Sequence, residues 1–143
     1  MALLFYDRNA GQGEFYDTDG QGNIALLKSY SGWRTSWTQI LRCFAQNANL
    51  NLLFYDSNAG AAEFYSTDGQ GGISQLSNST FSKGWTLIIP CQLGLAESFT
   101  DLLFYDHNRR VGEFYTADGQ GGIKLISSHT GWRSSWAEIV PDL

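Results

Sequence analysis

Two loops of this chain place a tryptophan directly before an arginine, a combination whose chemistry suits sugar binding. They are Trp33–Arg34 and Trp132–Arg133, and a glycine precedes each pair. An exposed indole can stack on the apolar face of a pyranose ring, while the arginine holds hydroxyl groups through charge-assisted hydrogen bonds. Packing over a sheet edge explains the same tryptophans without a ligand. The residues alone leave both interpretations open.

The corresponding loop in the middle of the chain carries Phe81 and Lys83. Phe81 stands where the other two loops have tryptophan, and Lys83 is the nearby cation. Lysine cannot reproduce the planar donor fork of arginine. We therefore expect the middle loop to bind a ligand less well than the other two.

A second repeated set consists of a glutamate that precedes a Phe-Tyr pair in three places. Its carboxylate can hold the hydroxyl groups of the same ligand. The candidate contacts are Glu14, Glu63, Glu113, Tyr16, Tyr65 and Tyr115. A solvated strand position, or a surface ion pair of small energetic value, is the alternative explanation for the glutamates.

Catalytic chemistry has little support in the sequence. The two histidines are His107 and His129, and the sequence shows no nucleophile elbow and no metal-binding motif. A carboxylate pair for glycoside hydrolysis is compatible with the composition. The acidic positions recur in all three repeats, however, whereas an enzyme concentrates its chemistry in one asymmetric place. We expect a protein that is not an enzyme and that needs no cofactor or metal.

All of these residues lie in a unit that occurs three times. The unit reads Leu-Leu-Phe-Tyr-Asp, then Glu-Phe-Tyr, then Asp-Gly-Gln-Gly, and its lead phenylalanines are Phe5, Phe54 and Phe104. Their spacing of about 50 residues is typical of a repeat architecture. We predict a single repeat domain over residues 1–143, with repeats 1–49, 50–99 and 100–143.

Each repeat has the pattern of four short strands joined by glycine turns. The strands expected in the first repeat are Leu3–Asp7, Glu14–Asp17, Ile24–Ser29 and Trp37–Ile40. The Asp-Gly-Gln-Gly stretch favours a hairpin because glycine tolerates a positive φ. No segment keeps the 3.6-residue period of a helix between caps. The repeated residues expected in the core are Trp37, Trp85, Trp136, Ile40, Ile88 and Ile139.

Two all-β architectures accommodate four strands repeated three times. A β-trefoil closes such units within one chain and would be a monomer. A β-propeller uses each unit as a blade of about 49 residues, but typical propellers have four to eight blades. Three blades therefore need a second chain, and a homodimer with closed symmetry would form a six-bladed ring.

The order of the motifs resembles the FG-GAP/VCBS type of bacterial propeller blade. Asp101–Leu102–Leu103 matches the opening strand of that family, and residues 136–141 match its closing strand. The resemblance implies three four-stranded propeller blades, and we keep the β-trefoil as the alternative. Blades of this family often bind calcium at the junction between repeats. Here the junctions at residues 43–51 and 91–101 hold too few carboxylates, so we expect no calcium site.

The composition narrows the partners and the compartment. A net charge of −5 disfavours a phosphate backbone, so we expect no nucleic acid partner. No apolar run reaches the roughly 18 residues that cross a membrane, so we expect no membrane insertion. Cys43 and Cys91 occupy equivalent places in successive repeats and are expected to be free thiols. The first repeat starts at once, which favours a protein without a signal peptide, cytoplasmic or non-classically released.

These expectations point to a multivalent lectin that binds glycans without catalysis. Similar shallow sites on each blade, doubled in a homodimer, raise the avidity for a glycan surface. The alternative is a structural or protein-interaction propeller in which the aromatic residues only build the blades. A glycosidase in the central cavity is a third possibility with less support.

Overall fold

The computed structural model describes residues 1–44, 50–94 and 100–141. Within these ranges the protein is all-β, with eleven strands in three antiparallel sheets and no helix. The all-β prediction is therefore confirmed. No helix in the described part of the chain is long and apolar enough to cross a membrane. The junction residues 45–49 and 95–99, which belong to the calcium expectation, lie outside the described residues.

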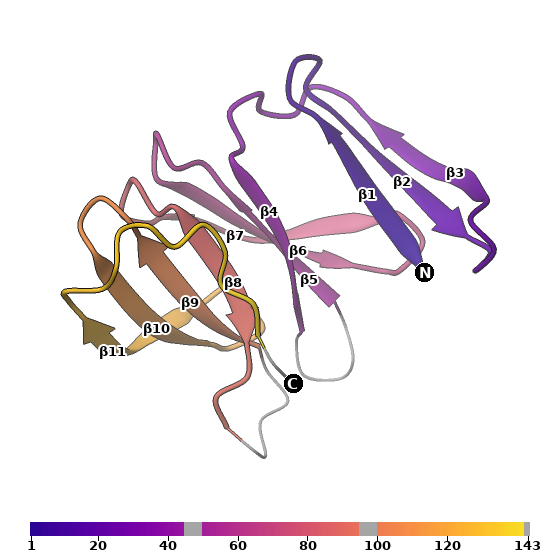
Figure 1. Cartoon of the computed structure of the whole chain (residues 1–143). Helices are drawn as coiled ribbons and strands as arrows, with labels where there is room; N and C mark the ends of the chain where they lie inside the picture. Colours follow the sequence, from indigo (N-terminus) through magenta and orange to yellow (C-terminus); the bar gives the residue numbers. More distant parts are fainter. Residues whose placement is uncertain (45–49, 95–99, 142–143) are drawn as a thin grey trace.

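The three sheets follow the order of the chain (Figure 1). The first sheet contains β1 (Ala2–Asp7), β2 (Gln12–Thr18) and β3 (Ile24–Tyr30). The second contains β4 (Gln39–Phe44), β5 (Leu50–Tyr55), β6 (Ala61–Thr67) and β7 (Ile73–Thr80). The third contains β8 (Leu87–Cys91), β9 (Asp101–Asp106), β10 (Val111–Ala117) and β11 (Ile123–His129). Within each sheet, strands that follow one another in the chain are hydrogen-bonded neighbours.

In the first and second repeats, the fourth strand belongs to the sheet of the next repeat. β4 pairs with β5, with Ile40 opposite Phe54, and β8 pairs with β9, with Ile88 opposite Phe104. The expected strand Trp37–Ile40 was placed too early, because β4 begins at Gln39 and Trp37 lies in the loop before it. Each of the second and third sheets thus receives its first strand from the preceding repeat.

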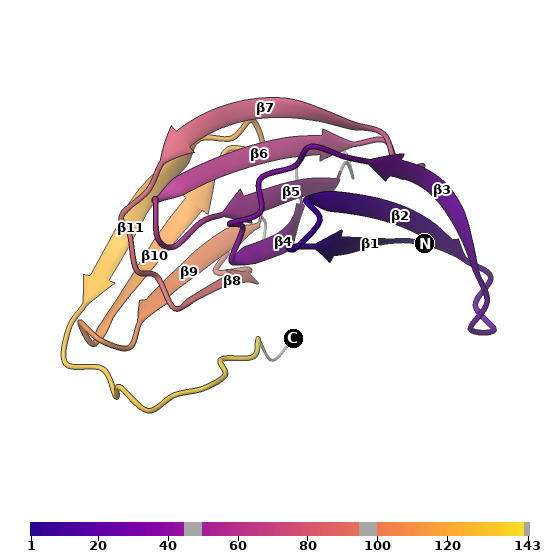
Figure 2. The ribbon, with the colours of Figure 1, turned by 90° about the horizontal axis from the view of Figure 1, so that it is seen from above.

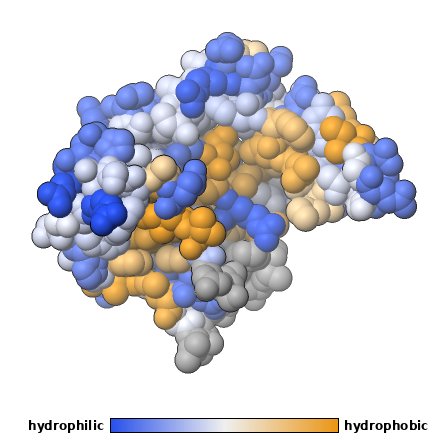
Figure 3. Space-filling view, viewed as in Figure 1, coloured by the Kyte–Doolittle hydropathy of each residue, from blue (hydrophilic) through white to orange (hydrophobic). Residues whose placement is uncertain are grey.

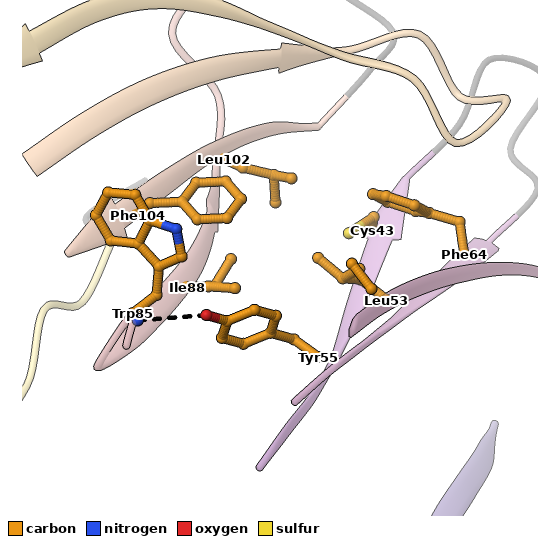
Figure 4. Packing of buried hydrophobic residues seen from close by; sticks show 9 residues of the cluster. Cys43, Leu53, Tyr55, Phe64, Trp85, Ile88, Leu102 and Phe104 are labelled. Carbon is orange, nitrogen blue, oxygen red and sulfur yellow. Dashed lines mark hydrogen bonds between the residues drawn. The ribbon is translucent and has the colours of Figure 1, made fainter. Parts of the chain in front are cut away.

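The main core lies between the second and third sheets, where β4 and β8 are in contact (Figure 4). Tyr55 crosses from the second sheet, and its hydroxyl accepts a hydrogen bond of 3.3 Å from the Trp85 main-chain N–H. Cys43 lies in this core and Cys91 is half-buried, and both are free thiols as predicted. Burial raises the pKa of Cys43 to about 12, and burial with the Asp101 charge raises the pKa of Cys91 to about 11.

The three repeated tryptophans expected in the core do not share one environment. Trp37 is 4% exposed and Trp85 is 3% exposed, because the following sheet covers each of them. Trp136 is 40% exposed, so its predicted burial is wrong for this chain. Beyond Trp136, the described residues 137–141 form no strand.

Seen from above, the three sheets form an arc that is open on one side (Figure 2). The first sheet lies at one end of the arc and the third sheet at the other. The chain after β11 turns back along the open side. Both the strand β1 and the C-terminal segment therefore border the opening.

Candidate functional site

The first two candidate loops lie between the last strand of one sheet and the first strand of the next, and the third follows β11. Each loop is tied to its own sheet at its aromatic residue. The Trp33 N–H donates to Gly11 O over 2.9 Å, and the Phe81 N–H donates to Gly60 O over 2.7 Å. The hydroxyl of Tyr6 then donates to Arg34 O over 2.5 Å. These bonds hold the loops in one position relative to the strands.

The indole of Trp33 packs flat against the strand β2. A Cβ atom added to Gly13 would lie 2.2 Å from its ring, and Tyr30 stacks on it with ring centroids 5.5 Å apart. The packing explanation considered for this tryptophan is thus supported by its contacts. Its ring nevertheless stays partly exposed and forms one wall of a cavity.

That cavity, of about 230 Å³, lies between the first loop and the second sheet. It brings together four of the residues singled out in the sequence, Trp33, Arg34, Glu63 and Tyr65. Trp33 and Arg34 come from the first repeat, whereas Glu63 and Tyr65 lie on β6 of the second. The site is therefore shared between neighbouring repeats, a pairing that the sequence did not reveal.

Phe54 forms the floor of this cavity. Its ring has edge-on contacts with Trp33, Trp37 and Tyr65, at centroid distances of 5.4, 5.6 and 5.1 Å. Such edge-to-face arrangements are the favoured geometry of aromatic pairs. Trp37 lines the cavity as well, although the sequence marked it only as a core residue.

The polar groups of the cavity form two pairs. The Tyr65 hydroxyl donates to Glu63 Oε2 over 2.6 Å. Burial raises the pKa of Tyr65, and the hydrogen bond to Glu63 and the charge of that carboxylate raise it further, which keeps the hydroxyl a donor. On the other side, the Arg34 guanidinium lies 3.7 Å from Asp56 Oδ2 and 5.2 Å above the Trp37 ring.

Asp56 is ionised in spite of its position. Burial opposes its charge, but hydrogen bonds from Ser36, Ala59 and Asn58 and the charge of Arg34 hold its pKa below the usual value. The cavity therefore offers a carboxylate acceptor at Glu63, a cationic donor at Arg34 and aromatic surfaces between them. This set can bind a neutral ligand that has hydroxyl groups and an apolar face.

The same arrangement recurs between the second loop and the third sheet. Phe104 takes the place of Phe54, with Phe81, Trp85 and Tyr115 at centroid distances of 5.6, 5.4 and 4.8 Å. The Tyr115 hydroxyl donates to Glu113 Oε2 over 3.3 Å. The residues of the second candidate site thus also meet across a boundary between sheets.

The cation of this second site is a residue that the sequence did not single out. Arg109 lies 5.1 Å above the Trp85 ring and donates to Asp106 Oδ2 over 2.6 Å. Arg34 has the corresponding place in the first site, above Trp37 and in an ion pair with Asp56. Lys83 contributes its main-chain oxygen, which accepts a hydrogen bond of 3.3 Å from Arg109. Arg109 stands where the other repeats have Ala10 and Ala59. This difference between the repeats could have pointed to Arg109 as the cation of the second site.

The third candidate set is not assembled within one chain. Glu14 and Tyr16 lie in the first sheet, hydrogen-bonded to each other over 2.6 Å. Trp132 and Arg133 follow the third sheet, at the other end of the arc (Figure 2). Of the three expected residue sets, the structure therefore brings two together within the chain.

In the described ranges, no group of three or more His, Cys, Asp or Glu residues could hold a metal ion. No family model and no curated protein matches the sequence. The structure is similar to the periplasmic gluconolactonase PpgL of Pseudomonas aeruginosa, with a TM-score of 0.52 and 13% sequence identity.

That similarity covers 92% of this chain and 40% of the gluconolactonase, so this chain spans less than half of the length of that protein. At 13% identity the likeness concerns the fold alone. It supports a propeller-like arrangement of the three sheets over a trefoil.

Proposed function

We propose that this chain is a lectin that binds sugars, without catalysis, at the junctions between neighbouring sheets. The observation that carries the proposal is the cavity of about 230 Å³ in which Trp33 and Arg34 meet Glu63 and Tyr65. An acceptor, a donor and aromatic walls at one place match the hydroxyl groups and the apolar face of a pyranose. The second junction repeats this set with Arg109 as its cation.

We further propose that the three sheets are blades and that two copies form one ring. Propellers contain four to eight blades. Six is the only multiple of three in that range, so two copies of a three-sheet chain close the smallest suitable ring. Several weak sites on one ring bind a glycan-coated surface with an avidity well above that of each site.

Isothermal titration of the purified chain with methyl glycosides of galactose, mannose, fucose and N-acetylglucosamine tests sugar binding. Arg34→Ala and Glu63→Gln are expected to weaken the first site at least tenfold, because each removes a charge-assisted bond worth about 1.5–3 kcal/mol. The matched control is Lys124→Ala, an exposed charge on β11. Its affinity should equal that of the unmodified chain.

Two outcomes would contradict the proposal. Absence of binding of every glycoside at millimolar concentration would leave a structural or protein-interaction module as the better explanation. Binding that is unchanged in both Arg34→Ala and Glu63→Gln would place the sugar elsewhere on the molecule.

A further inference from the structure

We infer that residues 137–141 add an inner strand to β1 of a second copy, and that this exchange completes the third sugar site from residues of both copies. The inference rests on the proposed dimer and specifies its interface. It follows from comparing the ends of the arc with the two junctions that the chain builds internally.

The strand β1 lacks a neighbour that its counterparts have. In the described residues β1 is hydrogen-bonded to β2 alone, whereas β5 and β9 are flanked on their other side by β4 and β8. Phe5 is consequently 48% exposed, while its equivalents Phe54 and Phe104 are each 1% exposed. Burial of apolar surface of this size is the main driving force for association. Within the described ranges, the free edge of β1 therefore lacks the inner strand that β5 and β9 have.

The segment after β11, residues 137–141, lacks a strand to pair with in the described part of the chain, whereas its equivalents β4 and β8 pair with β5 and β9. Its loop has the shape of the first loop: Gly32 and Gly131 both have a φ of 73°, and the same two-residue turn follows. After the first loop, Trp37 is buried and the chain enters β4. After the third loop, Trp136 is 40% exposed and Val140 is 78% exposed, and no strand follows in the described residues.

The two internal junctions predict how this segment would pair. Leu41 lies opposite Leu53 and Ile89 lies opposite Leu103, and the equivalent pair is Val140 with Leu4. By the same register Ile139 faces Phe5, as Ile40 faces Phe54 and Ile88 faces Phe104. Pro141 takes the place of Pro90 of β8, on a strand that is hydrogen-bonded on one side only, where proline is tolerated.

The outward-facing surfaces of the first and third sheets also match the contacts that neighbouring sheets make within the chain. Gly71 packs closely on Phe15 of the preceding sheet, and Gly121 packs closely on Phe64, so that an added Cβ would lie 3.1 and 3.5 Å from their Cβ atoms. A Cβ added to their equivalent, Gly22, would have nothing within 4 Å. At the far end, Ile126 of the third sheet is 50% exposed. The first sheet of one copy thus fits the third sheet of another.

Hydrophobic surface gathers at the two places that this pairing would cover (Figure 3). One is along β1, where Leu3 is 41% exposed, and the other is beside the C-terminal segment. A groove of about 420 Å³ runs next to β1, between the first and second sheets. Exposed apolar patches of this kind mark interaction sites in soluble proteins.

The exchange would also assemble the missing site. In the two internal sites the loop tryptophans contact a phenylalanine of the next sheet, which in turn contacts the tyrosine two residues after the glutamate. Phe5 already lies 5.2 Å from Tyr16, and Trp132 lies 5.6 Å from Trp136. Joining these halves from two copies places Arg133 of one beside Glu14 of the other. Each ring then carries four sites within chains and two between them.

Disulfide trapping tests the strand exchange. In a Cys43→Ala, Cys91→Ala background, Leu4→Cys combined with Val140→Cys puts cysteines at positions that the register places opposite each other. Most of the protein is expected to run as a linked dimer without reductant, since paired Cα atoms lie within the roughly 7 Å that a disulfide spans. The matched control, Leu4→Cys with Ala137→Cys, is off register by three residues, about 10 Å along a strand, and should not link.

The other outcomes overturn the exchange in distinguishable ways. A disulfide within one chain would mean that the C-terminal segment closes on its own β1. A dimer by native mass with no in-register link would leave the proposed ring but without strand exchange. A monomer by native mass would overturn both. None of these measurements depends on sugar binding, so failure of the lectin proposal is recognised separately.

A mixing experiment tests the shared site. Glu63→Gln and Glu113→Gln disable the two internal sites, and then one batch receives Glu14→Gln and another Arg133→Ala. Neither batch alone should bind the glycoside found for the unmodified chain. Refolded together, the two batches should bind one glycoside per mixed dimer, because one junction then pairs an intact Arg133 with an intact Glu14. Linked dimers that show no such recovery would overturn the shared site.

Discussion

Whether a loop carries tryptophan or phenylalanine depends on one small residue of the neighbouring strand. Gly13 and Gly112 lie under Trp33 and Trp132, and an added Cβ would be 2.2 Å from either ring. In the second repeat the equivalent residue is Ala62, fully buried, and the ring above it is Phe81. The aromatic residue is therefore matched to the space beneath it.

Because of this match, we expect the effects of Phe81→Trp and Ala62→Gly on the free energy of unfolding to be non-additive. Phe81→Trp alone should lower the free energy of unfolding by about 1–3 kcal/mol, the usual cost of overpacking. Adding Ala62→Gly should recover most of that loss, because it restores the Gly-Trp pair of the other repeats. Urea unfolding of both single variants and the double variant measures the coupling. Simple additivity of the two effects would contradict the explanation.

Asp106 should make stability sensitive to acid. Burial opposes its charge, but the bonds from Arg109 and Asn108 and the Arg109 charge hold its pKa below the usual value. Because the folded pKa is lower than the unfolded one, its contribution is full above the ordinary aspartate pKa of about 3.9 and is lost as pH falls through the folded value.

Asp106→Asn should therefore lower stability at neutral pH, by about 1–3 kcal/mol, because its partly buried donors lose a charged acceptor. It should also flatten the fall in stability below about pH 4. Urea unfolding between pH 7 and 2 measures both. Asp17→Asn, at an exposed ion pair with the N-terminus, is the control and should change little. An unchanged acid slope in Asp106→Asn would assign the effect to other carboxylates.

At the scale of the elements, the equivalent phenylalanines of the first and second sheets, Phe5 and Phe54, should stabilise different things: the dimer and the fold. Phe54→Ala removes a ring enclosed by three aromatic contacts and should cost about 3–5 kcal/mol of unfolding free energy. Phe5→Ala changes a ring that is 48% exposed in the single chain. It should weaken the dimer far more than the fold.

Sedimentation equilibrium over a dilution series, combined with urea unfolding, separates these effects. The dimer dissociation constant should rise at least tenfold for Phe5→Ala, while its unfolding under monomeric conditions stays near that of the unmodified chain. Equal losses of stability for Phe5→Ala and Phe54→Ala would mean that β1 is already covered within one chain.

The strands themselves were largely predictable from the sequence, since glycine turns and alternating aromatic residues bounded the first three strands of each repeat. The fourth strand was misplaced because Trp37 looked like a strand residue, whereas it lies in the loop before β4. Its pairing with the next sheet is a long-range choice that no local pattern expresses. For the same reason the sequence marked Trp33, Arg34, Glu63 and Tyr65, but not that they meet across adjacent repeats, and it did not single out Arg109.

At the scale of the whole molecule, threefold repetition concealed a difference between the ends and the middle. Trp37, Trp85 and Trp136 are equivalent in sequence, yet the first two are buried and the third is exposed. Arg109 is the converse case, since a residue that breaks the repeat takes the place of Arg34. Only the spatial arrangement shows that two of the candidate residue sets meet within the chain and that the third is divided between its ends.

The shift between repeats and sheets has a consequence for biosynthesis. Ribosomes add about 5–20 residues per second, and domains form in the order of synthesis. β4 and β8 emerge just before the strands that they flank, so the second and third sheets can form as the chain appears. In the proposed ring, by contrast, β1 is flanked only when residues 137–141 of another copy reach it. Maturation of the first sheet therefore depends on how often two copies meet.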